Sequence, residues 1–224
     1  MCGRFTLTVT QETLNQYLYE VFDLPYTKAV SHQPRYNIAP SQEVLAVIHD
    51  GEKYRVGKLK WGFVAGQGKK QSKPFSVINI RQESLTTKPM FQQAYRSKRC
   101  LILADGFYEW HQEQSKKQAY HITLPKQPIF AFAGLWNSYL DSANEKQYTC
   151  AIITTESVES IATIHHRMPI ILDRSNHADW LRPLEISAEQ VLSAAQSDFS
   201  LMKVSNYVNA VSHDDKACIV PLSP

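Results

Sequence analysis

The sequence predicts an α+β fold: a single domain with a largely antiparallel, barrel-like sheet and flanking helices. Three observations indicate this class. Strand-like runs outnumber helical ones, and the two do not alternate as they would in a parallel βαβ sheet. No repeat, linker or low-complexity stretch divides the 224 residues. Hydrophobic residues make up 43% of the chain, which is enough for one packed core.

The first third of the chain carries the clearest local signals. Thr10 is a suitable N-cap for a helix over 11–22, where apolar residues recur at helical spacing. A hairpin is predicted next, with strands over 43–49 and 53–59 joined by an Asp-Gly turn. The glycines and lysines of 64–73 then predict a mobile basic loop.

Most of the remaining signal is of strand type. Helices are predicted over 89–97, near 158–164 and 175–181, and from Ser187, where Gln190 completes a capping box. Strands are predicted over 75–80, 100–104, 107–111, 120–124, 129–136, 148–155, 201–204 and 217–220. Many short strands and few helices predict a barrel-like sheet rather than layered α/β architecture.

Composition narrows the setting in which the protein works. The four cysteines, at positions 2, 100, 150 and 218, form no CxxC pair and fit reduced thiols better than disulfides or a zinc site. No apolar run approaches the roughly 20 residues of a membrane span. The N-terminus lacks the cationic and apolar regions of a secretory signal. We therefore expect a cytosolic protein, without membrane contact and without a metal.

Charge is distributed unevenly along the chain. Residues 1–120 carry 17 Lys and Arg against 10 Asp and Glu, whereas the remainder is mildly acidic, and the whole chain has a net charge of +3. A basic half is typical of proteins that attract polyanions such as nucleic acids. It is equally typical of a solvated charged surface, so charge alone leaves both interpretations open.

The chain begins Met1-Cys2-Gly3, so removal of one methionine would leave an N-terminal cysteine. Such a residue carries an α-amine and a thiol on adjacent carbons, a pair that no internal residue offers. The amine titrates near pH 8 in peptides, which leaves roughly a tenth of it unprotonated at neutral pH. The thiolate is a strong nucleophile. The alternative is an incidental cysteine in a frayed terminus.

Three further segments place polar side chains beside strand signals. Asn79 and Arg81 share one face if their segment is extended. Glu109 lies between two aromatic residues after a turn, and His165 and His166 end a helix before a proline-stopped turn. Each also has a purely structural interpretation: a partner for buried backbone, an outward-facing glutamate, and a helix C-terminus stabilised by its dipole.

Two arginines near these segments, Arg35 and Arg167, are open to the same double interpretation. They are basic residues next to polar segments, but an arginine beside a carboxylate is also an ordinary structural ion pair. The residues alone do not decide between a ligand contact and a structural pair.

Together these segments resemble the SOS-response-associated peptidase family, whose members react covalently with abasic sites in single-stranded DNA. The resemblance is carried by ordered motifs from the first residue to nearly the last: MCGRF at 1–5, RYNIAPS at 35–41, WG at 61–62, NIRQES at 79–84, RCLILADGFYEW at 99–110, IHHRMPIIL at 164–172 and VSNYVNAV at 204–211. It implies one family domain over residues 1–224 and no cofactor.

The resemblance implies four reactive residues. Cys2 occupies the position of the family's reactive cysteine, whose amine forms a Schiff base with the abasic aldehyde before its thiol closes a thiazolidine ring. Glu109 matches the family's catalytic glutamate and His165 its catalytic histidine, which we expect to move protons. Asn79 matches the asparagine that orients the N-terminus.

The resemblance also implies an interface with single-stranded DNA that contains abasic sites. Arg4, Arg81 and Arg167 stand at basic motif positions and are candidates for phosphate contacts, which give affinity without sequence choice. Pro40 and Thr154 match positions that line the DNA groove. We expect the protein to act as a monomer.

The family's peptidase name adds hydrolase and lyase chemistry to the expectation. In the family, a short N-terminal extension is thought to be removed autocatalytically to expose the cysteine. Here only Met1 precedes Cys2, so an aminopeptidase would suffice. The Schiff base is the lyase-type step.

The chain departs from the family pattern at three places. Ile80 replaces the alanine common between the asparagine and the arginine, and Leu103 replaces a frequent proline. The loop at 63–70 lacks the family's aromatic wedge, and its lysines are expected to contact phosphate instead.

Two alternative functions remain at this point. Glutamine amidotransferases of the N-terminal-nucleophile class also use an N-terminal cysteine, but they pass ammonia to a second domain, which this chain does not show. The other alternative is a single-stranded DNA-binding module that has lost the reaction, although all four reactive positions are intact.

Overall fold

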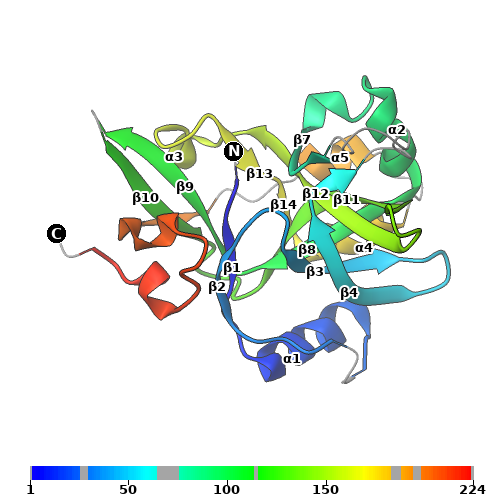
Figure 1. The fold of residues 1–224 in the computed structure, drawn as a ribbon, viewed down its shortest axis with the longest axis horizontal. Helices are drawn as coiled ribbons and strands as arrows, with labels where there is room; N and C mark the ends of the chain where they lie inside the picture. Colours follow the sequence, from blue (N-terminus) through cyan, green and yellow to red (C-terminus); the bar gives the residue numbers. More distant parts are fainter. Residues whose placement is uncertain are drawn as a thin grey trace.

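Five of the described strands close into a barrel in the computed structural model of the protein (Figure 1). The structure describes residues 2–25, 30–64, 76–113, 116–182, 188–193 and 198–222. Its strands are β1 Phe5–Leu7, β2 Arg35–Ile38, β3 Glu43–His49, β4 Tyr54–Trp61, β5 Phe63–Val64, β6 Ser76–Val77, β7 Asn79–Arg81, β8 Arg99–Ala104, β9 Gly106–Glu113, β10 Lys116–Thr123, β11 Phe130–Leu140, β12 Lys146–Glu156, β13 Arg167–Pro169, β14 Ile171–Leu172 and β15 Ser200–Val204.

The helices lie around this sheet structure. The α-helices are α1 Gln11–Phe22, α2 Pro89–Ser97, α3 Glu159–Ala162, α4 His177–Leu181 and α5 Ala188–Ser193, and the 3₁₀ turns are η1 Gln82–Ser84, η2 Arg174–Asn176, η3 Asn206–Asn209 and η4 Lys216–Ile219. Among the described residues, no helix is long and apolar enough to cross a membrane.

Hydrogen bonding closes the barrel in the order β12-β4-β3-β8-β11, with β11 pairing back to β12. Every pair except the parallel β12–β4 is antiparallel, which confirms the predicted largely antiparallel, barrel-like sheet. The five residues Cys100–Ala104 on β8 are fully buried. A continuous apolar run of this kind is typical of a strand covered on both faces.

A second sheet, ordered β15-β10-β9-β1-β2, packs beside the barrel and carries the N-terminal segment (Figure 1). β1 pairs with β9 on one side and β2 on the other, with Phe5 opposite Phe107 and Ile38. Phe5 is fully buried and meets Trp61 and Phe132 edge to face. This packing fixes the first residues of the chain between the two sheets.

Several predicted elements agree with the structure residue by residue. The helix predicted over 11–22 is α1, and the Thr10 hydroxyl accepts the Thr13 N–H as its N-cap. The predicted hairpin is β3–β4, in which Gly51 takes φ 105°. Such a φ favours glycine, because the Cβ of any other residue would crowd its own backbone.

Other predicted elements differ from the structure. The strand predicted over 217–220 is wrong, because the Asp215 side chain caps a 3₁₀ turn there and the buried Cys218 anchors it. The single strand predicted over 75–80 is two strands, β6 and β7. The chain changes partner at Ile78, whose carbonyl accepts from Trp61 Nε1 and from the Ile152 N–H.

Some predictions fall on residues that the structure leaves undescribed. Residues 65–73 of the predicted basic loop and the Ser187 cap lie outside the described residues. The helix near 158–164 is the shorter α3, and that near 175–181 begins as η2 and continues as α4.

Candidate active site

The backbone of Cys2 is held in place by Asn79. The Asn79 side-chain amide donates to the Cys2 carbonyl oxygen at 2.8 Å. Asn79 begins β7, whose parallel pairing with β12 sets it opposite Ile152 on the barrel wall. The Asn79 Oδ1 atom is buried and accepts no hydrogen bond from the described residues. Because buried polar atoms are normally paired, this oxygen is available to a ligand.

The thiol of Cys2 lies in an apolar environment. The residue is fully buried, and its Sγ makes only a long contact of 3.7 Å to the Arg4 carbonyl. Burial raises the pKa of this thiol well above its usual range, and the nearby Glu109 carboxylate raises it further. The sulfur is therefore a neutral thiol at neutral pH and needs a base before it acts as a nucleophile.

Glu109 lies close enough to Cys2 to influence its charge. It is on β9, opposite Tyr120 of β10, and its side chain is 2% exposed. Burial raises the pKa of its carboxyl from 4.5 to about 7. The structure thus excludes the outward-facing alternative for this glutamate. A carboxyl that titrates near 7 can both give and accept a proton at physiological pH.

His165 follows α3 in the loop that leads into β13. Its Nδ1 lies 3.0 Å from the backbone N–H of Arg167, and its ring stacks on His166 at 4.5 Å between centroids. Burial lowers its pKa below the usual value, so the imidazole is mostly neutral at pH 7. A neutral imidazole can accept a proton and return it.

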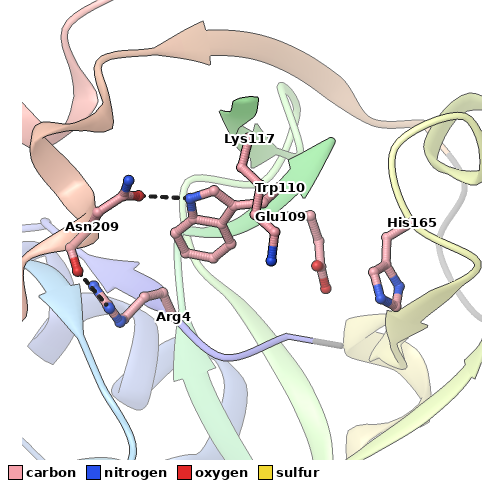
Figure 2. Close-up of a pocket in the computed structure, with 6 residues that line it drawn as sticks. All are labelled: Arg4, Glu109, Trp110, Lys117, His165 and Asn209. Carbon is pink, nitrogen blue, oxygen red and sulfur yellow. Dashed lines mark hydrogen bonds between the residues drawn. The ribbon is translucent and has the colours of Figure 1, made fainter. Parts of the chain in front are cut away.

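One pocket of about 410 Å³ is lined by two of the four predicted reactive residues, Glu109 and His165 (Figure 2). Glu109 and His165 project into it from different elements, β9 and the loop before β13, and Arg4 and Trp110 form its other side. The described residues that line it are Arg4, Glu109, Trp110, Lys117, His165 and Asn209. The volume falls in the range of small-molecule sites.

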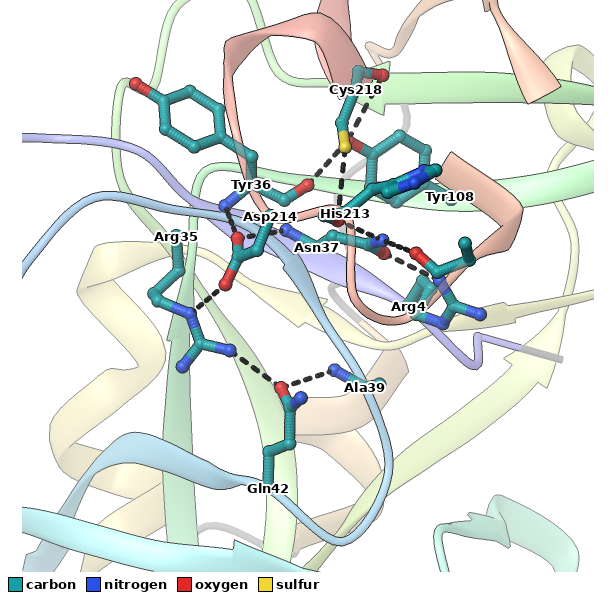
Figure 3. Close-up of polar contacts among 11 residues, drawn as sticks. Arg4, Arg35, Tyr36, Asn37, Ala39, Gln42, Tyr108, His213, Asp214 and Cys218 are labelled. Atoms are coloured by element: carbon teal, nitrogen blue, oxygen red, sulfur yellow. Dashed lines mark hydrogen bonds and ion pairs between the residues drawn. The ribbon is translucent and has the colours of Figure 1, made fainter. Parts of the chain in front are cut away.

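The wall next to Arg4 is built by the C-terminal segment (Figure 3). The Arg4 guanidinium donates to Asn37 Oδ1 and to the Val208 carbonyl, both at 2.7 Å, and to the Asn209 carbonyl at 3.1 Å. The Trp110 indole N–H donates to Asn209 Oδ1 at 2.7 Å. Arg4 therefore links the start of the chain to Val208 and Asn209 of η3.

A buried asparagine binds the same C-terminal segment through hydrogen bonds. Asn37 is fully buried, and its side-chain amide donates to the carbonyls of Val208, Ala210 and His213 at 2.6–3.1 Å. Asp214 accepts the backbone N–H groups of Tyr36 and Asn37 at 2.5 and 2.9 Å, and it pairs with the Arg35 guanidinium (Figure 3). Arg35 is thus a structural ion-pair partner.

The guanidinium of Arg167, a predicted phosphate contact, is also bonded to other groups of the protein. Its side chain is 8% exposed and forms a bidentate pair with Glu83 at 2.7 and 3.1 Å, while its Nη2 donates to the Thr154 carbonyl at 2.6 Å. Such a two-point fit is typical of arginine and carboxylate groups. The position of Arg167 therefore orders the loop that carries His165.

The remaining predicted DNA contacts lie on two separate elements. Arg81 is exposed at the end of β7 and stands opposite the buried Thr154 of β12 in register. Pro40 lies in the turn between β2 and β3, next to Ser41, which takes φ 72°. The structure brings Arg81, Thr154 and Arg167 together, whereas Pro40 belongs to another segment, and the DNA contacts stay predictions.

Sequence reasoning did not single out three of the pocket residues, namely Trp110, Lys117 and Asn209. Trp110 and Asn209 lie inside quoted motifs, so their motif membership was the available signal. Lys117 had none, because one lysine in a basic half cannot be told from its neighbours. In the described part of the chain, no group of His, Cys, Asp and Glu side chains is arranged to hold a metal ion.

Solved structures share this barrel with its flanking sheet. A protein from Bacteroides thetaiotaomicron superposes with a TM-score of 0.77 over 99% of this chain and all of its own, at 20% identity. A phage-related protein from Bordetella bronchiseptica gives 0.71 over 91% of this chain and 94% of its own, at 25% identity. These likenesses define the class as a known α+β barrel fold.

Sequence comparison places the chain more narrowly. The model of the SOS response associated peptidase (SRAP) family matches residues 1–211. The chain is 40% identical to the abasic site processing protein YoaM of Bacillus subtilis, over 94% of this chain and 93% of that protein. It is 30% identical to the abasic site processing protein YedK of Escherichia coli, over 99% and 100%. The chain belongs to the SOS response associated peptidase family.

Proposed function

We propose that this protein processes abasic sites in single-stranded DNA by linking itself covalently to them through Cys2, once Met1 has been removed. The observation that supports the proposal is that Asn79 binds the Cys2 carbonyl and Glu109 lies close to the Cys2 thiol, while Glu109 also shares a pocket with His165. Two relatives that match nearly the whole chain are named abasic site processing proteins, which supports the substrate class.

The proposed reaction needs no cofactor. The unprotonated Cys2 amine attacks the aldehyde carbon of the ring-opened sugar, and the carbinolamine loses water to give a Schiff base. The thiol then adds to the same carbon, its proton passes to the nitrogen, and a thiazolidine ring results. The net change is two new bonds to carbon and the release of one water. Ring closure is favoured because the thiol is tethered to the reacting atom.

Glu109 supplies the proton transfers that this sequence requires. The buried thiol is neutral, so a base must take its proton as the sulfur–carbon bond forms. The departing water needs a proton in the preceding step. A carboxyl with a pKa of about 7 next to Cys2 fits both roles, since it is partly ionised at neutral pH.

His165 and Asn79 act on the sugar. The neutral imidazole of His165 faces Glu109 across the pocket and is placed to assist ring opening and to reverse the crosslink (Figure 2). Asn79 orients the N-terminus through the Cys2 carbonyl, and its free Oδ1 can accept a hydrogen bond from the sugar hydroxyl. Together they hold the reacting atoms in a near-attack arrangement.

The proposal extends to the DNA strand and the setting. Arg81, which is exposed, is proposed to contact a phosphate, with Pro40 and Thr154 along the groove. Arg4 and Arg167, whose guanidinium groups are bonded within the protein, are proposed to hold the walls of that groove in place. We propose that the protein acts as a monomer in the bacterial cytoplasm or nucleoid. We also propose that lyase-type Schiff-base chemistry is its enzymatic activity, with peptidase chemistry limited to exposing Cys2.

Intact mass spectrometry tests the proposal. The purified protein is incubated with an abasic single-stranded oligonucleotide, and Cys2→Ala and Cys2→Ser serve as variants. We expect loss of Met1 and a heat-stable adduct on the wild type, no stable adduct on Cys2→Ala, and at most a labile one on Cys2→Ser, which lacks the thiol.

The same measurement separates the alternatives. A processed wild type that binds the oligonucleotide without forming an adduct would contradict the proposal and favour the non-catalytic binding module. Hydrolysis of glutamine by that preparation would favour an amidohydrolase. An undiminished stable adduct on Cys2→Ala would assign the chemistry to a lysine.

A further inference from the structure

The active-site pocket contains a cation that the proposed chemistry does not use. Of the described lining residues, Arg4 and Lys117 carry positive charge. The Arg4 guanidinium donates hydrogen bonds to two carbonyls of the C-terminal segment and to Asn37. Lys117 is exposed and has no ion-pair partner within the described ranges of the chain. It is therefore the pocket cation that remains available to an anion.

The backbone around Lys117 is fixed, so its side chain enters the pocket from a defined position. Lys117 stands opposite Gln112 in the β9–β10 pairing, and its carbonyl accepts the Asn206 side-chain amide at 3.0 Å. Figure 2 shows the ammonium reaching down beside Trp110 and Glu109. The hairpin's other carboxylate, Glu113, is paired with Lys203 at 3.0 Å and does not compete for Lys117.

An abasic nucleotide offers little else to recognise. It has no base, so the fixed charges beside its sugar are the two flanking phosphodiesters. A lysine ammonium is a compact point charge with three donors and is a common phosphate ligand. With the sugar carbon at Cys2 and Glu109, a flanking phosphate lies at the pocket rim, where a flexible lysine side chain can reach it.

We propose that Lys117 binds one of the two phosphodiesters that flank the abasic sugar and thereby positions the sugar over Cys2. This inference rests on the proposed function, because it assumes the same ligand in the same pocket. Lys117 touches the substrate but takes no part in bond making. It makes binding at the lesion depend on a single phosphate charge.

The adjacent residue provides a matched control. Lys116 is also an exposed lysine, but its side chain lies on the opposite face of β10 from that of Lys117, and it is not among the described residues that line the pocket. Lys116→Ala therefore removes the same net charge without removing the proposed contact. Lys117→Arg restores the cation in the pocket. Exposed substitutions of this kind leave stability within about 0.5 kcal/mol.

The test is a binding cycle with wild-type protein and an unreactive probe. The probe is a single-stranded oligonucleotide with a tetrahydrofuran abasic analogue, which cannot open to an aldehyde. Each flanking phosphodiester is replaced in turn by a neutral methylphosphonate, and Kd is measured by fluorescence anisotropy. We expect one of the two replacements and Lys117→Ala each to weaken binding about tenfold, as for a charge-assisted contact.

The decisive result comes from measuring each protein variant with each methylphosphonate probe. If Lys117 binds that phosphate, replacing it with a methylphosphonate leaves the Kd of Lys117→Ala unchanged. The same replacement raises the Kd of Lys116→Ala as much as that of wild type, and the Kd of Lys117→Arg nearly as much. If both methylphosphonates weaken Lys117→Ala as much as they weaken wild type, the inference is overturned. Because the probe cannot react, this result is independent of adduct formation. A wild type that forms no adduct with the reactive oligonucleotide contradicts the proposed function instead.

Discussion

Glu109 shows how one buried carboxyl links stability to pH. Burial gives it a pKa of about 7 in the folded protein against 4.5 in the unfolded chain. Between these values the folded state binds more protons than the unfolded state, so this group's contribution falls as pH rises toward 7. The fold therefore carries a cost at neutral pH that serves the proposed proton transfers.

Replacing the glutamate with a neutral isostere removes that cost. We expect Glu109→Gln to gain stability over wild type by up to about 3 kcal/mol as the pH rises from 5 to 8. Urea unfolding at intervals across this range measures it. We expect the same variant to form the crosslink much more slowly, without the wild type's inflection near pH 7. A stability difference that does not change with pH would contradict the raised pKa.

Gly106 is a position where the absence of a side chain matters. A Cβ there would lie 2.1 Å from His121 Nε2 and 2.8 Å from Thr6 Oγ1, both in a buried polar cluster with Asp105. We expect Gly106→Ala to lower the free energy of unfolding by about 1–3 kcal/mol, as for other overpacked cores. Thermal unfolding measures this, and Gly57→Ala, which meets nothing within 4 Å, is the control.

At the scale of elements, the C-terminal segment behaves as one wall of the site. Asn37 binds three of its carbonyls, and Arg4 binds two. We expect Asn37→Ala to lower the free energy of unfolding by about 2 kcal/mol, because it removes a buried amide that binds three carbonyls and accepts from Arg4. Crosslink yield should fall with it, since Asn209 and Trp110 lose their anchor.

A substitution within the wall provides the comparison. Tyr207→Phe removes only the exposed hydrogen bond to Asp215 at 3.0 Å, so we expect it to change stability by less than about 0.5 kcal/mol. Equal effects of the two variants on unfolding would show that Asn37 does not hold the segment.

What could be predicted from sequence depended on how local the cause is. α1 was predicted correctly because its cap and its apolar spacing lie within 13 residues, Thr10–Phe22. β1 and β2 were not predicted as strands, because three and four residues give too little periodicity to detect. The strand predicted over 217–220 was wrong because burial of Cys218 against a separate small core decides that segment.

The candidate site follows the same division. Cys2 is notable on chemical grounds alone, whereas Asn79, Glu109 and His165 were chosen through family resemblance. The raised pKa of Glu109 and the lowered pKa of His165 arise from packing between distant segments, which no local pattern encodes. The involvement of Arg167 in an ion pair was foreseen as an alternative, but its partner Glu83 was not.

At the scale of the whole molecule, charge decides how the protein meets its proposed substrate. The basic first half contributes Arg4, Arg81 of β7 and Lys117 of β10, although the net charge is only +3. Single-stranded DNA binding should therefore depend on salt with a slope of about −0.7 per phosphate contacted.

A strand held through about three phosphates gives a measurable prediction. The unreactive Cys2→Ala variant should lose roughly 10–20-fold in affinity between 50 and 200 mM salt. Fluorescence anisotropy with a tetrahydrofuran-containing oligonucleotide measures the slope. An affinity insensitive to salt would mean that the arginines and lysines of the site do not face phosphate.

The pairing of β1 with β9, and the bond from Arg4 to a carbonyl 204 positions further along, also bear on how the protein folds. Contacts this distant in sequence form late and slowly, because a long loop must close before they can be made. Until that step, Cys2 is an ordinary thiol on an unfolded strand, without Glu109 or Asn79 beside it. We expect the pocket that would select an abasic sugar to be complete only after that step, so that folding supplies the selectivity that an exposed N-terminal cysteine lacks.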